Sequence, residues 1–167
     1  MTFITHLHIS IADQCLLAYS QQEQVARYRI STAKNGAGER SGSGCTPRGE
    51  HIIRAKIGAG LPYAAVLKGR RWTQEICTSE LYQAYPERDW ILSRILWLSG
   101  TELGRNRLGQ VDTFQRYIYI HGTPDEEPMG IAMSHGCIRM RNADIIQLFD
   151  QVILGCRVTI SEKSLQT

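Results

Sequence analysis

The chain has 167 residues, a length that suits one domain and allows roughly 70% of the unfolded surface to become buried. Its net charge is +3, with basic and acidic residues interspersed, whereas a nucleic-acid-binding protein carries a continuous basic stripe. We therefore predict a single domain over residues 1–167 and no nucleic-acid partner. The mild positive charge is compatible with a small acidic substrate.

The start of the chain lacks the features of an export signal, because His6, His8 and Asp13 interrupt its apolar residues and no basic segment precedes them. No segment approaches the length of a membrane span. The cysteines are odd in number, widely scattered and without a CxxC pair, which is typical of a reducing compartment. These patterns predict a cytoplasmic protein with no membrane partner. They leave its oligomeric state open.

The first third of the chain has the alternation of β-strands. Residues 2–11 place one set of side chains on a single face: Phe3, Thr5, Leu7, Ile9 and Ile11. After a turn at Asp13 and Gln14, residues 15–20 are expected to pair with this strand as a hairpin. Residues 25–32 form a third strand. The next segment, 34–49, holds five glycines and a proline, so it is predicted to be a loop.

Further strands are expected at 50–58, 93–100 and 114–122, while residues 59–90 show no clear period and stay unassigned. One helix is predicted over 143–153, since apolar residues recur there at helical spacing: Ile145, Leu148, Phe149 and Val152. Asn142 is its expected N-cap and Gly155 its expected end, and residues 156–162 form a last strand. The fold class is mostly β with one or two helices (α+β).

The candidate site lies in "HGTPDEEPMGIAMSHGCIRM", residues 121–140, which brings His121, His135 and Cys137 into one short segment. An imidazole beside a thiol can accept its proton and lower its pKa, which makes the cysteine a nucleophile. By strand alternation His121 shares a face with Tyr119 and Tyr117, which are expected to line a substrate groove. A positive φ at Gly136 would aim backbone N–H groups at one point, as an oxyanion hole requires.

Other readings of these residues are weaker. The two histidines and Cys137 would give zinc three ligands, but neither paired cysteines nor an HExxH motif is present, so no metal and no cofactor are expected. A serine hydrolase is disfavoured because no GxSxG motif occurs. The remaining cysteines and histidines are expected to have no catalytic role. Cys15 and Cys156 should lie in the core, and Cys45 and Cys77 have no companion motif. His6 and His8 should be half-exposed, and His51 should be structural.

"IHGT" followed by "SHGCIRM" resembles the active-site signature of the YkuD-type L,D-transpeptidase family. The resemblance extends to "YRISTA", "CTPRGEHII" and "VTI", and is weakest over 59–90. It implies a β-sandwich-like or barrel-like mixed sheet with the catalytic turn at one end.

The resemblance also implies roles for single residues. Cys137 would be the acylated nucleophile, and His121 the general base and acid, its ring oriented by the Gly122 carbonyl. Ser134 and His135 would shape the nucleophile turn, with the backbone N–H groups of Gly136 and Cys137 serving the oxyanion. Arg139 would pack the turn or bind a substrate carboxylate.

The implied reaction removes D-alanine from the L-centre of a diamino acid, commonly meso-diaminopimelate, in a peptidoglycan tetrapeptide stem. If the protein is cytoplasmic, water is the abundant acceptor for the resulting thioester. We therefore predict an L,D-carboxypeptidase of muropeptide recycling. The alternatives are an L,D-transpeptidase, which passes the acyl group to an amine, and a module that binds muropeptides without turnover.

The stretch from 59 to 119 is longer than a compact strand connection needs, so part of it is expected to form a lid or wall over the groove. Its aromatic candidates are Tyr82, Tyr85 and Trp90. A basic residue, Arg107 or Arg116, is a candidate to anchor a substrate carboxylate.

Overall fold

The computed structural model describes residues 2–165 and contains ten strands, two α-helices and one short 3₁₀-helix within them. In chain order the elements are β1 (Ile4–Ser10), β2 (Cys15–Ser20), β3 (Glu23–Ser31), β4 (Gly49–Ile57), β5 (Ala65–Lys68), β6 (Arg71–Ile76), α1 (Ser79–Ala84), β7 (Ile91–Gly100), η1 (Gly109–Val111), β8 (Tyr119–Thr123), β9 (Ile138–Arg141), α2 (Asn142–Gln151) and β10 (Val152–Ser161).

Eight of the strands close into a barrel. The sheet runs in the order β4-β10-β1-β2-β3-β9-β8-β7, and a further pairing between β4 and β7 joins its two ends. The β1–β10 and β8–β9 pairs are parallel, whereas the other pairs in this ring are antiparallel. Closure leaves the ring without unpaired edges. The expectation of a mostly β fold with a barrel-like mixed sheet is confirmed.

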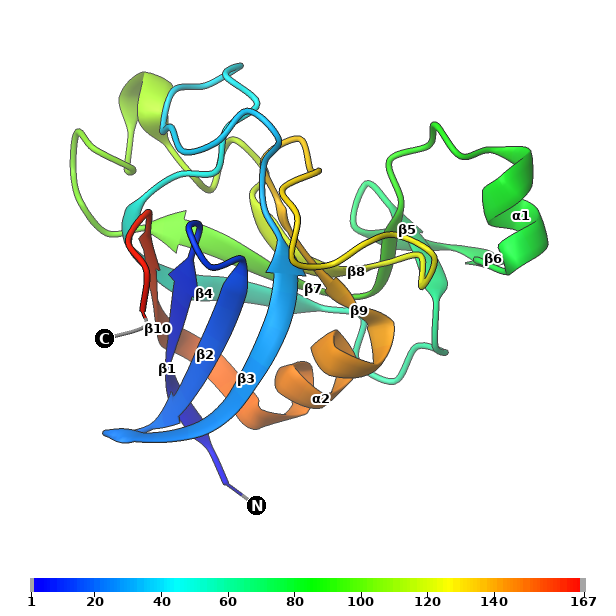
Figure 1. Cartoon of the computed structure of the whole chain (residues 1–167), viewed down its shortest axis with the longest axis horizontal. Coiled ribbons are helices and arrows are strands. Elements are labelled where there is room, and N and C mark those ends of the chain that lie inside the picture. The colour runs from blue at the N-terminus through cyan, green and yellow to red at the C-terminus, as the bar shows by residue number, and fades with distance from the viewer. Residues whose placement is uncertain (1, 166–167) are drawn as a thin grey trace.

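The main core fills this barrel with aliphatic side chains from its strands and from one face of α2. Ile145, Leu148 and Phe149 of the helix are buried against it, as their spacing predicted. Figure 1 shows α2 at the lower end of the barrel, while the glycine-rich loop that precedes β4 lies at the opposite end. That loop is without regular strands or helices, as expected.

The alternation predicted for residues 2–11 is wrong at its beginning. Phe3 and Thr5 are exposed, whereas Ile4 is fully buried and Leu7 and Ile9 point inward with it. The pairing of β1 with β10 is irregular at this point, since Ile4 lies opposite Val152 and His6 opposite Arg157, and this irregularity interrupts the alternation.

The ends predicted for α2 are also wrong. Arg141 is the N-cap, because the Asn142 side chain is bound to Ser93 and Thr123 instead. At the other end the backbone turns extended at Val152, which begins β10. Gly155 lies inside that strand at φ 87° and does not end the helix.

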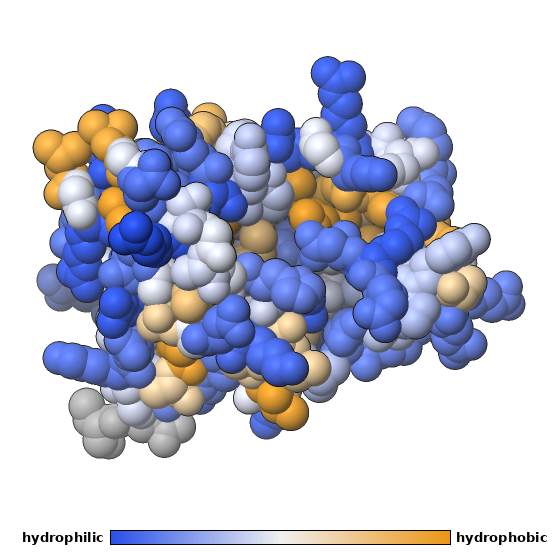
Figure 2. Space-filling model, turned by 90° about the horizontal axis from the view of Figure 1, so that it is seen from above, coloured by the Kyte–Doolittle hydropathy of each residue, from blue (hydrophilic) through white to orange (hydrophobic). Residues whose placement is uncertain are grey.

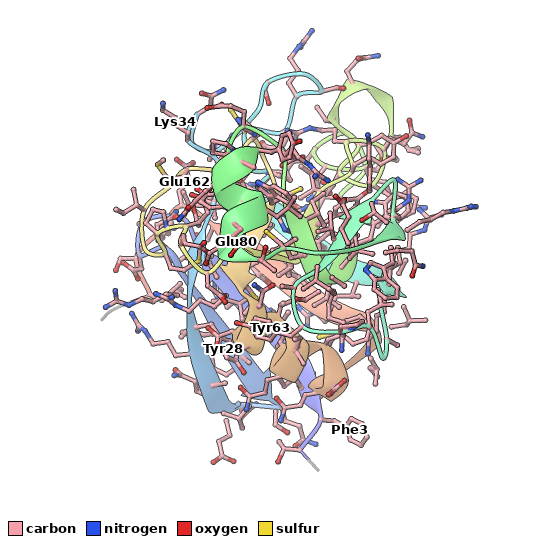
Figure 3. The ribbon with its side chains drawn as sticks, turned by 90° about the vertical axis from the view of Figure 1, so that its right-hand side faces the viewer. Phe3, Tyr28, Lys34, Tyr63, Glu80 and Glu162 are labelled. Carbon is pink, nitrogen blue, oxygen red and sulfur yellow. The ribbon has the colours of Figure 1, made fainter. Side chains whose placement is uncertain are left out.

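The segment 59–90, unassigned from sequence, extends the sheet beyond the barrel. β5 pairs with β7 and with β6, and α1 follows. Trp90, Leu92 and Val66 form a separate small core beneath it. In Figure 3 Glu80 on α1 and Tyr63 before β5 lie on the same side of the molecule, which this extension forms.

Only the second half of the strand predicted at 114–122 exists. Residues 114–117 form turns, with Tyr117 N–H bound to the Phe114 carbonyl at 3.1 Å and φ 57° at Tyr117, and β8 begins at Tyr119. The turn redirects the chain just before the candidate site.

Seen from above in Figure 2, the surface is mainly hydrophilic, and its hydrophobic atoms lie in separate groups. Between residues 2 and 165, neither α-helix has the length and apolar character needed to cross a bilayer.

Candidate active site

The parallel pairing of β8 with β9 brings the two ends of the signature together. Ile120 lies opposite Ile138 and His121 opposite Arg139, so Cys137, just before β9, is level with Tyr119. A cavity of about 300 Å³ opens at this point. Seven of the nine predicted site residues line it: Tyr117, Tyr119, His121, Ser134, His135, Cys137 and Arg139. Gly122 and Gly136 lie in the adjoining backbone.

Cys137 is held by backbone groups on both sides of the turn before β8. Its thiol donates to the Tyr117 carbonyl at 3.3 Å, and its sulfur accepts the Tyr119 N–H at 3.3 Å. Tyr117 has φ 57° and lies in the turn that precedes β8. Burial raises the pKa of the Cys137 thiol to about 12, so the thiol is protonated at neutral pH.

His121 is 2% exposed and has one fixed ring nitrogen. Nδ1 lies 2.6 Å from the Gly122 carbonyl oxygen, which only accepts, so Nδ1 carries the proton. Nε2 has no hydrogen-bond partner within residues 2–165 and is available as a base. Burial lowers the pKa of His121, which favours the neutral ring. The thiolate–imidazolium pair suggested by the sequence is therefore disfavoured at rest, because burial penalises both charges.

The nucleophile turn is braced internally by Ser134. Its hydroxyl donates to the Cys137 carbonyl at 2.6 Å and accepts the Gly136 N–H at 3.2 Å. The Gly136 N–H is thus occupied in this structure, which argues against the oxyanion role expected for it. Gly136 has φ 136°, and a Cβ there would lie 3.3 Å from Ile118 Cδ1, so both conformation and space favour glycine.

Thr46 holds the same turn from outside, a contact that the sequence reasoning missed. Its hydroxyl accepts the Ala33 N–H at 2.9 Å and donates to the Gly136 carbonyl at 2.9 Å, and all three residues are buried. The Thr-Pro pair after the glycine-rich loop was the only available signal, because the partners lie 13 and 90 residues away.

A polar cluster around Asn142 packs against Gly122, the residue that follows His121. Asn142 donates to the Thr123 carbonyl at 2.9 Å and to Asp125 at 3.2 Å, and it accepts the Ser93 hydroxyl at 2.6 Å. A Cβ on Gly122 would collide with Asn142 Oδ1 and would lie 2.6 Å from the Leu92 carbonyl oxygen. Gly122 is therefore required by the packing around the histidine.

The charges at the cavity are mostly positive: Arg70, Arg116 and Arg139 against Asp89. The guanidinium of Arg116 is occupied, since it donates to the carbonyls of Cys45 at 2.6 Å and Gly38 at 3.2 Å. Arg116 thus holds the glycine-rich loop through both of its terminal nitrogens.

Arg107, the other candidate anchor, is exposed and does not line the cavity. Arg139 does line it, and its side chain forms no hydrogen bond or ion pair within the part of the chain that the structure describes. Of the basic residues named from the sequence, Arg139 is the one placed to meet a substrate.

The wall expected from residues 59–119 is present, but its aromatic candidates are wrong. Segments around Gly69 and Asp89 line the cavity, whereas Tyr82, Tyr85 and Trp90 do not. Trp90 is 4% exposed and packs with Tyr82 in the small core of the extension. The extension has a core of its own, which uses Trp90 and Tyr82, whereas Tyr85 is exposed.

Other histidines and cysteines behave as structural residues. Cys15 and Cys156 are buried in the barrel, and His51 is buried between the Gly49 carbonyl and the Thr113 hydroxyl. Across residues 2–165, His, Cys, Asp and Glu side chains nowhere form a group of three or more with the arrangement of a metal site.

Comparison with protein families gives a match to the YkuD model, described as the L,D-transpeptidase catalytic domain, over residues 4–160. Two curated relatives match shorter segments. The putative L,D-transpeptidase YkuD of Bacillus subtilis (strain 168) is 52% identical over 42 residues, which are 25% of this chain and 26% of the relative. The probable L,D-transpeptidase ErfK/SrfK of Escherichia coli (strain K12) is 48% identical over 48 residues, 29% of this chain and 16% of the relative.

Solved structures share the fold over most of the chain. An L,D-transpeptidase from Xylanimonas cellulosilytica superposes with a TM-score of 0.54 at 18% identity, covering 96% of this chain and 62% of that one. L,D-transpeptidase 3 from Mycobacterium tuberculosis superposes with a TM-score of 0.57 at 15% identity, covering 94% of this chain and 60% of that one. The matched parts are thus about a quarter or less of these two curated relatives and under two thirds of the two solved chains.

Proposed function

Because this chain belongs to the L,D-transpeptidase catalytic domain family, we propose that Cys137 attacks a peptide carbonyl and becomes acylated. One observation carries the proposal: the Cys137 thiol and the His121 ring, whose Nε2 has no partner among the described residues, line a single cavity. A nucleophile, a base and a group that orients the base are the parts that covalent acyl transfer needs.

The first half-reaction begins with the Cys137 thiol and the His121 ring both uncharged. His121 Nε2 accepts the thiol proton as the sulfur attacks the carbonyl carbon, so the charged pair exists only while the bond forms. The Tyr119 N–H, 3.3 Å from the sulfur, stabilises the developing thiolate. When the carbon–nitrogen bond breaks, His121 returns the proton to the leaving amine, and a thioester remains on Cys137.

We propose a peptidoglycan tetrapeptide stem as the donor, cleaved at the L-centre of its diamino acid with release of the terminal D-alanine. The positive cavity supports this choice. A tetrapeptide ends in a carboxylate close to the reacting carbonyl, and Arg139 lines the cavity with its guanidinium donors unused.

For the second half-reaction we propose water as the acceptor, which makes the protein an L,D-carboxypeptidase. The cationic lining supports water, because an acceptor amine approaches as an ammonium ion and is repelled by Arg70 and Arg139. The five free cysteines support a reducing compartment. There the donor would be a soluble stem returned from the wall, and we propose cytoplasmic recycling on this basis. The names of the relatives favour the alternative, transfer to an amine.

Mass spectrometry of the products separates the two reactions. The purified protein is incubated with a soluble diaminopimelate-containing tetrapeptide muropeptide, with and without a free D-amino acid as acceptor. Tripeptide and D-alanine, with little exchange or dimer, are the expected products. Crosslinked dimer or exchanged stem as the main product would establish the transpeptidase instead. Cys137→Ala is the control and should release no D-alanine.

A further inference from the structure

Arg70 occupies a strained position at the edge of the cavity. It is the second residue of the two-residue turn between β5 and β6, where Gly69 has φ 54° and Arg70 φ 62°. Glycine or asparagine adopts this conformation at lower cost than a long side chain does. Strain of this kind is concentrated at functional sites in proteins.

The Arg70 guanidinium is held in place by aromatic rings. It lies 4.6 Å from the centroid of Trp97 and 5.3 Å from that of Tyr117, and it donates to the Tyr119 hydroxyl at 3.1 Å. The other face of the Trp97 ring is stacked on Phe114 at 3.9 Å. We call Trp97 and Phe114 the aromatic column. A guanidinium stacked in this way is pre-organised for a planar anion.

Arg70 has no carboxylate partner between residues 2 and 165. Other arginines on the surface do have one: Arg48 pairs with Glu39, and Arg88 with Glu75. Arg70 instead keeps most of its N–H donors unused, although its position is fixed by the rings. A fixed, unpaired guanidinium is suited to bind an anion from outside the chain.

The surroundings of Arg70 also indicate where on the substrate that anion lies. A second cavity of about 310 Å³, lined by the aromatic column and Gln115, shares Arg70 and Tyr117 with the first. Cys137, His121 and Arg139 line the first cavity only. Arg70 therefore stands where the two cavities meet, and the aromatic side chains of Tyr117 and Trp97 beside it suit the methylene groups of a long side chain.

We propose that Arg70 is a specificity-determining residue, whose guanidinium binds the side-chain carboxylate of the donor residue that Cys137 attacks. This inference rests on the proposed function, since it assumes a peptide donor. It adds that a donor whose side chain ends in a carboxylate beyond several methylene groups is preferred over one without that carboxylate.

Equilibrium binding tests the inference without turnover. Two tetrapeptides that differ only in this carboxylate, one with diaminopimelate and one with lysine at the L-centre, are titrated into Cys137→Ala protein by calorimetry. We expect the diaminopimelate peptide to bind about 10- to 100-fold more tightly, the range of a hydrogen bond to a charged group. Adding Arg70→Gln should bring the ratio of the two peptides' dissociation constants close to one, and Arg70→Lys should restore part of the preference for the diaminopimelate peptide.

Arg54 provides the matched control. Its guanidinium lies 4.1 Å from the centroid of Phe114, at the far end of the aromatic column, and it is exposed and does not line either cavity. Arg54→Gln should leave the ratio unchanged. An unchanged ratio in Arg70→Gln, or an equal loss in both variants, would overturn the inference.

Turnover assays then separate this inference from the proposed function. With Cys137 present, Arg70→Gln should raise KM for the diaminopimelate peptide and change kcat little, because the side-chain carboxylate that Arg70 binds takes no part in the bonds that break. Arg70-dependent binding without release of D-alanine would support the inference and refute the carboxypeptidase. Release of D-alanine with the same peptide preference in wild type and Arg70→Gln would support the carboxypeptidase and refute the inference about Arg70. Failure of both peptides to bind would overturn the inference.

Discussion

Gly122→Ala perturbs the backbone that orients the catalytic histidine. The new Cβ would collide with Asn142 Oδ1 and lie 2.6 Å from the Leu92 carbonyl oxygen, about 1 Å inside an optimal contact. Neither neighbour can move easily, because Leu92 is paired with Gly122 in the sheet and Asn142 is fixed by hydrogen bonds to Ser93 and Thr123. Overpacking of this kind costs about 3 kcal/mol of unfolding free energy, which lowers Tm by roughly 6–12 °C in a chain of this size.

The same shift would displace the Gly122 carbonyl, which lies 2.6 Å from His121 Nδ1. A misplacement of about 1 Å in a catalytic group costs on the order of 100-fold in rate. We therefore expect kcat/KM to fall by about that factor at a temperature where the variant is fully folded. The loss should appear mainly in kcat, since Gly122 does not line the cavity.

Urea unfolding and turnover of a tetrapeptide donor measure the two effects. Gly155→Ala is the control, because Gly155 has φ 87° with no atom within 4 Å of its Cβ position and lies in β10. Gly155→Ala should lower the free energy of unfolding by about 1–2 kcal/mol, which is the cost of a left-handed conformation at a non-glycine residue, and should keep its activity. If Gly122→Ala were as stable and as active as wild type, the steric account of His121 orientation would be wrong.

Three other predictions concern the turn, the thiol and a buried histidine. Thr46→Val leaves the Ala33 N–H and the Gly136 carbonyl without a partner, so urea unfolding should show a loss of about 2–4 kcal/mol; an unchanged midpoint would contradict this. Because burial raises the pKa of Cys137 to about 12, its alkylation by iodoacetamide should keep accelerating above pH 9, and a plateau there would refute the raised pKa. Burial lowers the pKa of His51 from 6.5 to about 4, so the unfolded state binds more protons between these values. Stability should therefore be lost as pH falls from 6.5 towards 4, by about 3 kcal/mol, and His51→Gln should show a shallower pH dependence in the same unfolding assay.

Local patterns predicted the elements whose burial is regular. The hairpin of β1 and β2, the apolar face of α2 and the glycine-rich loop were all found, because each depends on residues close in sequence. The segment 59–90 was not assigned, since its strands are short and residues such as Ala64, Arg70 and Gln74 have positive φ. Such positions break the period on which strand recognition depends.

The site residues also divide into those that the local sequence identifies and those that long-range contacts place. Cys137 and His121 stand out through the residues on either side of them, and both line the cavity. Asn142 was expected to cap a helix, but its amide is used by Ser93 and Thr123, which lie 49 and 19 residues away. Thr46 was missed for the same reason. Contacts over such separations are set by the closure of the barrel and leave no local pattern.

If Cys137 carries the acyl group, intact-protein mass spectrometry should detect the acylated protein. The protein is mixed with a tetrapeptide donor, quenched in acid within the first turnovers and then digested for peptide mapping. We expect an added mass equal to the tripeptide acyl group, located on Cys137 and absent in Cys137→Ala. Product formation with the acyl group on another residue, or turnover that persists in Cys137→Ala, would contradict it.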